Sequence, residues 1–433
     1  MDILFANDRA GEYPPSWYAA TATAPGPFPS ATGDMTADVC IVGAGYTGLS
    51  AALHLREKGY DVVLIDAHRV GWGASGRNGG QVGTGQRLDQ EALEKLVGNT
   101  RAHALWDLAQ ESVATTKALA AEHAPEAGFA PGILHACHRA RYVPHAKAYA
   151  EKMARDYGYN EIRPLGADEM HHMIGSPAYV GGDLDMGGGH LHPLRYAFGL
   201  ARAARAEGVR IHENSKATGI SFGTPATVTT DKARISARHV ILACNGYLGR
   251  LNRRTAARVM PINNFIIATE PMTAEAQEKI VRGNHAVADS KFVINYFRFS
   301  EDHRLLFGGG ETYGYRFPTD IAALVRKPML EIFPQLKNTK ITHAWGGTLG
   351  ITMNRMPHFE RLAGNILSVS GYSGHGVAMA TLGGKLAAKA IAGQAERFDV
   401  MAGVPSPAFP GGAAMRWPLL VLAMVWFSLR DRL

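Results

Sequence analysis

The sequence predicts an α/β protein built around a Rossmann-like dinucleotide-binding unit, and three observations near the N-terminus support this. Residues 39–42 form an apolar run typical of a buried parallel strand. The run ends in the spacing G-x-G-x-x-G, after which apolar residues recur at helical intervals. A second apolar run, residues 62–65, ends at Asp66, roughly 20 residues further on, where an acid that binds ribose is expected. The unit predicts a site for an ADP moiety, although its spacing alone does not separate NAD from FAD.

Each glycine of this turn is expected for a steric reason. Gly43 permits the tight turn, Gly45 lets backbone approach a pyrophosphate, and Gly48 lets helix and strand pack closely. The N-terminus of the helix then faces the phosphates, where free N–H groups and the helix dipole favour negative charge. The residues expected to contact the ADP moiety are Gly43, Gly45, Tyr46, Thr47, Gly48, Asp66 and Ala67.

The segment GWGASGRNGGQ, residues 71–81, is too polar and glycine-rich for a buried strand. It resembles the segment after the second strand in FAD-dependent amine oxidoreductases of the D-amino-acid oxidase and sarcosine oxidase superfamily. Within that superfamily, its residue sequence is most similar to the gamma-glutamylputrescine oxidoreductase branch. The resemblance implies a glutathione-reductase-type FAD fold with a second, α+β lobe whose mixed sheet carries the substrate. A surface turn with a solvated arginine is the alternative interpretation. Flavin contacts are implied for Ala74, Ser75, Gly76, Arg77, Asn78, Gly79, Gly80 and Gln81.

Two later stretches also resemble the cofactor segments of this superfamily. Residues 239–246 read as a buried strand that ends in a small-residue turn, and residues 343–376 resemble the closing flavin motif. The helix expected over 377–391 would point its N-terminus at the flavin oxygen that gains charge on reduction. His375 is a candidate general base, but we favour a positioning role for it. The residues implied to contact the cofactor are Ala243, Asn245, Gly246, Gly347, Gly350, Gly374, His375 and Gly376.

Composition excludes several classes of protein. The 433 residues are 46% hydrophobic and 19% charged, which suits a globular protein with two lobes. The formal charge of +7 includes no dense basic run, so no nucleic-acid partner is expected. The three cysteines lie far apart and the N-terminus lacks the pattern of a signal peptide, which together predict a reducing, cytoplasmic location. No metal site is expected, because the adjacent His171 and His172 would point in different directions on a helix, and His190 and His192 lack a third ligand nearby.

The domain organisation follows from these segments. We expect an N-terminal arm (1–36), a discontinuous FAD-binding domain (37–90, 187–255 and 340–400), a substrate domain (91–186 and 256–339) and a tail (401–433). The apolar run within residues 415–430 is about 10 residues long, whereas a membrane span requires about 20, so no transmembrane helix is expected. Its flanking arginines suit peripheral docking on the inner membrane or on a partner subunit. Packing of this helix against its own lobe is the interpretation we rank first.

On the substrate side, residues 260–270 and 291–309 read as antiparallel strands. Their aromatic residues are expected to form pocket walls, together with later aromatics. A gamma-glutamyl substrate would bring a carboxylate into the pocket, and an unpaired buried charge is costly, so an arginine should meet it. A solvated strand position is the alternative for either arginine. The residues proposed to bind substrate are Tyr296, Arg298, Tyr313, Arg316 and Trp345.

The resemblance implies oxidation of an amine C–N bond by hydride transfer to flavin N5, which gives an imine and then an aldehyde. Gamma-glutamylputrescine is the first substrate expected, in putrescine catabolism; an amino or imino acid such as pipecolate, proline or sarcosine is the second. A flavin-bearing electron-transfer subunit is the alternative from another class. Residues 345–352 lack the cysteine that attaches FAD in several relatives, which implies non-covalent FAD. Residues 304–308 lack the oxygen-activating lysine of these relatives, which argues against direct use of oxygen. The expected electron acceptor is therefore left open between oxygen and another acceptor.

Overall fold

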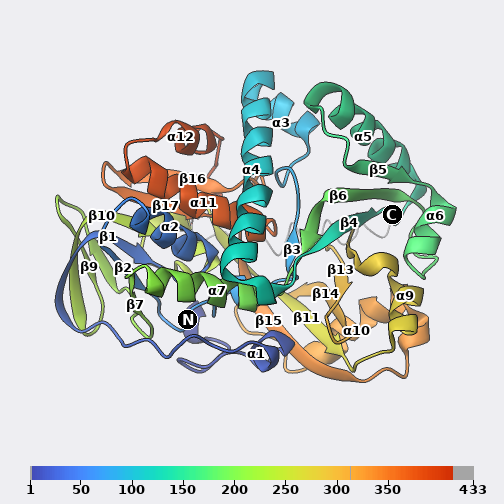
Figure 1. The fold of residues 1–433 in the computed structure, drawn as a ribbon, viewed down its shortest axis with the longest axis horizontal. Coiled ribbons are helices and arrows are strands. Elements are labelled where there is room, and N and C mark those ends of the chain that lie inside the picture. Colours follow the sequence, from blue (N-terminus) through green and yellow to red (C-terminus); the bar gives the residue numbers. More distant parts are fainter. Residues whose placement is uncertain (1, 313, 413–433) are drawn as a thin grey trace.

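The computed structural model describes residues 2–312 and 314–412, and it contains two large sheets that lie side by side (Figure 1). The first sheet has its central strands parallel and supports the glycine turn. Its order is β16 (His358–Ala363), β17 (Ile366–Ser370), β10 (Ala233–Leu242), β1 (Gly33–Val42), β2 (Val62–Ile65) and β7 (Arg210–His212), with β9 (Ala226–Thr229) on β10 and β8 (Gly219–Ser221) on β9.

The second sheet contains both parallel and antiparallel strands. Its order is β15 (Ile341–Ile351), β11 (Met260–Thr269), β14 (Leu305–Thr312), β13 (Tyr296–Phe299), β12 (Ala286–Asp289), β4 (Ala130–Ala136), β6 (Gly182–His190) and β3 (Gln81–Val82), with β5 (Ile162–Leu165) on β6. The longer helices are α2 (Tyr46–Arg56), α3 (Gln90–Val97), α4 (Asn99–His123), α5 (Val143–Tyr157), α7 (Pro193–Ala206), α10 (Ile321–Ile332) and α11 (Gly376–Ile391). The shorter ones are α1 (Trp17–Thr21), α6 (Ala167–Met173), α8 (Arg253–Ala256), α9 (Ala274–Ile280) and α12 (Glu396–Ala402).

The predicted strand, turn and helix are confirmed in the first sheet. The last four residues of β1 are buried and pair in parallel with β2 and β10, so this strand is covered on both faces. Helices α2, α7 and α11 cover one face (Figure 1), and Leu49, Leu200 and Leu382 belong to one buried cluster there. Val63 and Val228 belong to a separate cluster. The glycine turn is therefore anchored by a rigid core.

Some segments belong to a different sheet from the one that the domain boundaries expected from sequence imply. The sequence places residues 340–400 in the cofactor domain, but β15 pairs with β11 along its whole length in the second sheet. The pairing of β3 and β6 in that sheet shifts the boundaries expected at 90 and 187 as well. Conversely, α4 was assigned to the substrate domain, yet Leu105 and Leu108 pack in the same cluster as α2 and α11. Strand pairing across long sequence separations decides these memberships, and an apolar pattern does not specify the partner.

The N-terminal arm joins both sheets. Trp17 and Tyr18 of α1 are buried, and the Tyr18 ring contacts Trp345 of β15 with centroids 5.1 Å apart. The predicted apolar helix within 415–430 and the predicted pocket residue Tyr313 lie outside the described residues. In the part of the chain that the structure describes, no helix combines the length and apolar character that a bilayer span requires, and no group of three potential metal ligands is present.

Candidate active site

A cavity of about 1320 Å³ runs from the glycine turn after β1 to the strands β4, β6 and β12 of the second sheet. Pockets for drug-sized ligands usually measure about 300–1,000 Å³, so this one has room for a larger ligand or for two ligands. One end is lined by the start of α2 and by Asp66. The other end, called the inner end below, is lined by polar side chains such as Arg87, His135 and Asp183.

The glycine turn is shaped for close approach to a ligand. Gly43 has φ +111°, and a Cβ there would lie 2.7 Å from the Ala243 carbonyl oxygen, so only glycine fits. Gly45 begins α2 without a side-chain cap, and the N–H of Tyr46 donates to Ser75 Oγ over 3.0 Å. Gly45 and Thr47, at the start of α2, also line the cavity, as an anion-binding helix terminus requires.

Asp66 ends β2 beside this turn. Its carboxylate accepts hydrogen bonds from the backbone N–H groups of Ala44, over 2.7 Å, and His68, over 2.9 Å. Burial raises the pKa of Asp66 to about 6, although these backbone donors act in the opposite direction. Asp66 therefore holds the turn in shape and also lines the cavity.

Most of the cofactor contacts expected from sequence line this cavity, and four glycines do not. Those four lie behind its wall, where a Cβ would collide with neighbouring atoms. At Gly48 it would come 1.9 Å from the Gly43 oxygen, and at Gly80 it would come 2.1 Å from the Leu191 oxygen. The other two are Gly76 and Gly350. The expected residues that line the cavity are Gly43, Gly45, Tyr46, Thr47, Asp66, Ala67, Ala74, Ser75, Arg77, Asn78, Gly79, Gln81, Ala243, Asn245, Gly246, Gly347, Gly374, His375 and Gly376.

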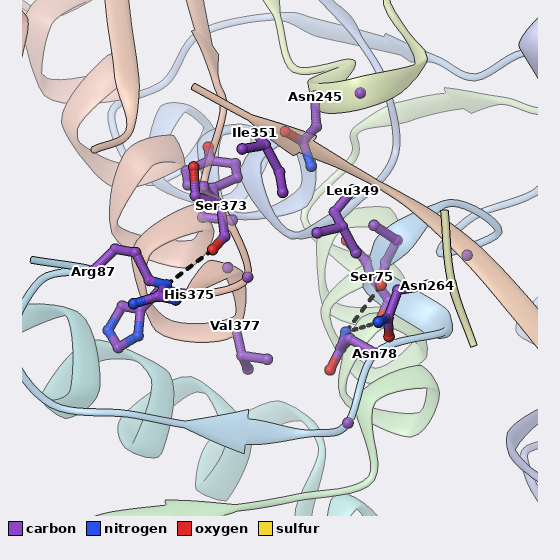
Figure 2. A pocket seen from close by; sticks show the side chains of 18 of the residues that line it. Ser75, Asn78, Arg87, Asn245, Asn264, Leu349, Ile351, Ser373, His375 and Val377 are labelled. Carbon is purple, nitrogen blue, oxygen red and sulfur yellow. Dashed lines mark hydrogen bonds between the residues drawn. The ribbon is translucent and has the colours of Figure 1, made fainter. Parts of the chain in front are cut away.

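A second helix N-terminus, that of α11, also reaches the cavity, where Gly376 and Val377 line it. Figure 2 shows Arg87 and His375 beside Ser373, with Ser75, Asn78 and Asn264 on the other side of the pocket. His375 Nε2 lies 3.0 Å from the Gly85 carbonyl oxygen. Burial, followed by the charge of Arg87, lowers the pKa of His375 to about 4. This neutral ring is tied to the loop after β3, as a positioning role requires.

This constellation of two sheets, a glycine turn and a second helix terminus agrees with comparisons to known proteins. The DAO family, described as FAD dependent oxidoreductase, matches residues 38–390. The chain belongs to this family. It is thus a FAD-dependent oxidoreductase of the amine and amino-acid oxidase type, and the family resemblance inferred from sequence is confirmed.

Two curated relatives match nearly the full length of this FAD-dependent oxidoreductase. A probable oxidoreductase OrdL from Rhizobium meliloti is 43% identical over 96% of this chain and 97% of that protein. The gamma-glutamylputrescine oxidoreductase of Escherichia coli is 40% identical over 98% of this chain and 99% of that protein. Among solved structures, glycine oxidase from Geobacillus kaustophilus superposes with a TM-score of 0.73 at 19% identity, covering 87% of this chain and 100% of that one, which shows the shared fold.

The structure places several predicted substrate residues away from the cavity. Arg298 is buried, and its guanidinium donates to the carbonyl oxygens of Gly79, Phe299 and Leu191 at 2.8–3.1 Å. It therefore braces the loop behind the cavity. The side chain of Arg316 is exposed and outside the cavity lining. The sequence pattern predicts that one of these arginines binds a carboxylate, but carbonyl oxygens occupy the Arg298 guanidinium and Arg316 lies outside the cavity lining.

Of the aromatic residues predicted to form pocket walls, one lines the cavity and another lies behind it. Trp345 is buried behind the wall, where its Nε1–H donates to the Arg77 carbonyl oxygen over 3.0 Å, whereas Tyr296 lines the cavity. Arg77 lines the cavity, and its guanidinium pairs with Asp8 over 2.9 Å and lies 4.3 Å from the Trp72 ring centroid. Its cation therefore braces the flavin-loop segment and the N-terminal arm.

Sequence reasoning missed the polar residues at the inner end. Arg87 lies between β3 and α3, and its Nε donates to the Ser373 carbonyl oxygen over 3.2 Å. No described residue accepts a hydrogen bond from its two terminal nitrogens. A signal was present, because the glycine-rich run continues past Gln81 through Gly83 and Gly85. The other missed lining residues include His135, Tyr149, Asp183, Asp185, Asn264 and Ser373.

Proposed function

We propose that this FAD-dependent oxidoreductase oxidises the terminal amine of gamma-glutamylputrescine. The near full-length similarity to the E. coli enzyme of that name supports this substrate. The observation that carries the proposal is the presence of both charge signs on the inner wall of the cavity. Arg87 supplies a cation there, and Asp185 supplies a carboxylate. A gamma-glutamyl group carries one carboxylate and one ammonium, so its charges complement this wall.

Arg87 is the residue we assign to the substrate carboxylate. Burial and the charge of Arg355 lower the pKa of Arg87, which indicates a cation that has lost part of its hydration. An arginine remains protonated under such conditions, and its planar fork can bind a carboxylate through two parallel hydrogen bonds. Because the Nε–H is already held by Ser373, the terminal nitrogens have a fixed direction.

We infer that the N-terminus of α2 and Asp66 hold the ADP part of FAD, and that the turn Gly374–Gly376 faces its flavin. The cradle at Gly43, which a Cβ would fill, supports this fit. Bound FAD would accept a hydride from the carbon next to the amine nitrogen, and the imine left after loss of the N–H proton would react with water to give an aldehyde and ammonia. The chain supplies orientation and exclusion of water.

The apolar part of the inner wall suits the four-carbon chain between the amide and the reacting amine. Ile133, Phe292 and Ile294 line this region. Burying methylene groups against them is favourable by about 0.8 kcal/mol each. A small imino acid such as proline would gain little from this wall, which is why we rank it second.

Anaerobic reduction of the flavin tests the proposed function directly. Gamma-glutamylputrescine should bleach the flavin absorption band, and free putrescine, proline and sarcosine should do so only at much higher concentration. If a cyclic imino acid bleaches the band and gamma-glutamylputrescine does not, the substrate assignment is wrong. If none of these amines bleaches it, the electron-transfer role gains support. Reoxidation by oxygen compared with a soluble quinone then identifies the acceptor.

A further inference from the structure

His135 and Asp183 form an ion pair in the wall of the inner cavity. They lie opposite each other on the paired strands β4 and β6, and His135 Nδ1 is 2.7 Å from Asp183 Oδ1. The Asp183 side chain is 10% exposed, whereas that of His135 is 49% exposed and lines the cavity. Nδ1–H therefore points at the buried carboxylate, and Nε2 has no hydrogen-bond partner among the described residues.

The charges around His135 keep its ring protonated. Burial favours the neutral ring, but Asp183 and then Asp185 outweigh it and raise the pKa of His135 to about 9. Asp183 and Asp185 both lie on β6. Cys137, which follows β4, lines the same cavity. At neutral pH the ring is thus an imidazolium whose Nε2–H is a charge-assisted donor.

Arg87 and His135 both line the cavity. Both disfavour the protonated form of His375, so both lie within electrostatic range of the same ring. Two hydrogen-bond donors that carry positive charge suit a carboxylate ligand, whose two oxygens can accept from both. An imidazolium has no lone pair with which to accept a proton, so His135 in this state does not act as a base.

We propose that His135 determines substrate specificity by donating its Nε2–H to the carboxylate of the gamma-glutamyl group, alongside Arg87, with Asp183 as the residue that positions and charges it. This inference rests on the proposed function for the identity of the carboxylate. It extends that function by naming a second anchor, on a different strand, for the same group.

Binding of a ligand that cannot be oxidised separates this inference from the proposed function. N-butylglutaramate has the gamma-glutamyl carboxylate without either amine, and N-butylglutaramide is its neutral carboxamide. Binding of each to the FAD-loaded enzyme is followed by perturbation of the flavin spectrum. His135→Asn keeps a donor for Asp183 but removes the charge. It should raise the Kd of the carboxylate at least roughly tenfold at pH 7.5, and that of the carboxamide less than roughly twofold, by the same affinity scale.

Asp183→Asn provides a second test, because it should move a pH profile. In the parent enzyme the Kd of N-butylglutaramate should stay constant from neutral pH and rise as the pH passes about 9, where the imidazolium loses its proton. In Asp183→Asn the rise should begin at a lower pH, closer to the ordinary histidine pKa of about 6.5, with Asp185 still raising the pKa of His135. His172→Asn, at an exposed position of α6, is the control and should change neither value.

Two results would overturn the inference. One is an equal loss of affinity for the carboxylate and the carboxamide in His135→Asn. The other is an unshifted pH profile in Asp183→Asn that retains its flavin. Neither result depends on turnover, so a failure of gamma-glutamylputrescine to reduce the flavin would remove the proposed substrate while leaving the binding measurement readable on its own.

Discussion

Asp66 Oδ2 lies 2.7 Å from the backbone nitrogen of Ala44, so the acid at the end of β2 fixes the turn at the end of β1. Strands β1 and β2, which pair in the sheet, are thereby joined again by a side chain at the ends that face the cavity. A carboxylate that accepts hydrogen bonds from backbone N–H groups contributes about 1.5–3 kcal/mol for each bond. The same side chain both shapes the turn and faces the cavity.

Asp66→Ala should therefore weaken FAD retention and loosen the turn, while the two sheets remain folded. The measurement is the ratio of FAD to protein after gel filtration, with circular dichroism as the check on folding. Asp61→Ala is a suitable control, since this carboxylate is at the surface and pairs with Arg210. Full FAD occupancy in Asp66→Ala would remove the assigned role.

The glycines of the turn should respond differently to alanine. At Gly48 a Cβ would meet the Gly43 backbone oxygen at 1.9 Å, whereas at Gly45 it would meet Ser75 Oγ at 2.8 Å. Backbone cannot move aside as a serine side chain can, and overpacking typically costs about 1–3 kcal/mol, occasionally more. Gly48→Ala should lower the melting temperature of the FAD-free protein strongly. Gly45→Ala should leave it nearly unchanged and reduce FAD affinity; equal melting temperatures would contradict this.

Arg87→Met should raise the gamma-glutamylputrescine concentration needed for half-reduction at least roughly tenfold, or about 1.4 kcal/mol of binding. Arg87→Lys should lose less, because a point charge replaces the planar fork. Arg316→Met is the matched control at an exposed position and should bind like the parent. Stopped-flow reduction under anaerobic conditions measures all three. If Arg87→Met matches Arg316→Met, the carboxylate is held elsewhere.

The buried ion pair of Arg77 and Asp8 should be important for stability. The Arg77 side chain is 1% exposed and that of Asp8 is 13% exposed, so Asp8→Ala leaves a buried cation without its carboxylate. Loss of one partner from such a pair costs about 3–5 kcal/mol. Asp2→Ala breaks a half-exposed pair with Lys216 and should cost no more than about 1 kcal/mol. Denaturant unfolding of both variants compares the two values, and similar losses would be unexpected.

FAD should be released completely by acid precipitation. Cys244 lines the cavity, but its thiol donates to the Val42 carbonyl oxygen over 3.4 Å, and burial raises its pKa to about 12. Burial likewise raises the pKa of Cys137 to about 11. Since the thiolate is the nucleophilic form, neither cysteine is suited to attach a flavin. A yellow protein pellet with a colourless supernatant would contradict this prediction.

The sequence by itself determined the cofactor end of the molecule. The strand over residues 39–42, the turn at Gly43 and the acid at Asp66 depend on contacts within about 30 residues, roughly the length of one βαβ unit, so their pattern can be read locally. The closing turn at Gly374 was found in the same way, because a glycine before a helix is a local signal. These segments line one cavity in the structure.

Only the tertiary structure decided the substrate end. The position of Arg298 between aromatic residues on a strand favours a pocket role, but its hydrogen bonds to the distant carbonyl oxygens of Gly79 and Leu191 make it a structural brace. Arg87, His135 and Asp183 come from a loop and two strands, and pairing of β4 with β6 brings the last two within 2.7 Å. Strand partners are selected by the packing of the whole sheet, which no local pattern encodes.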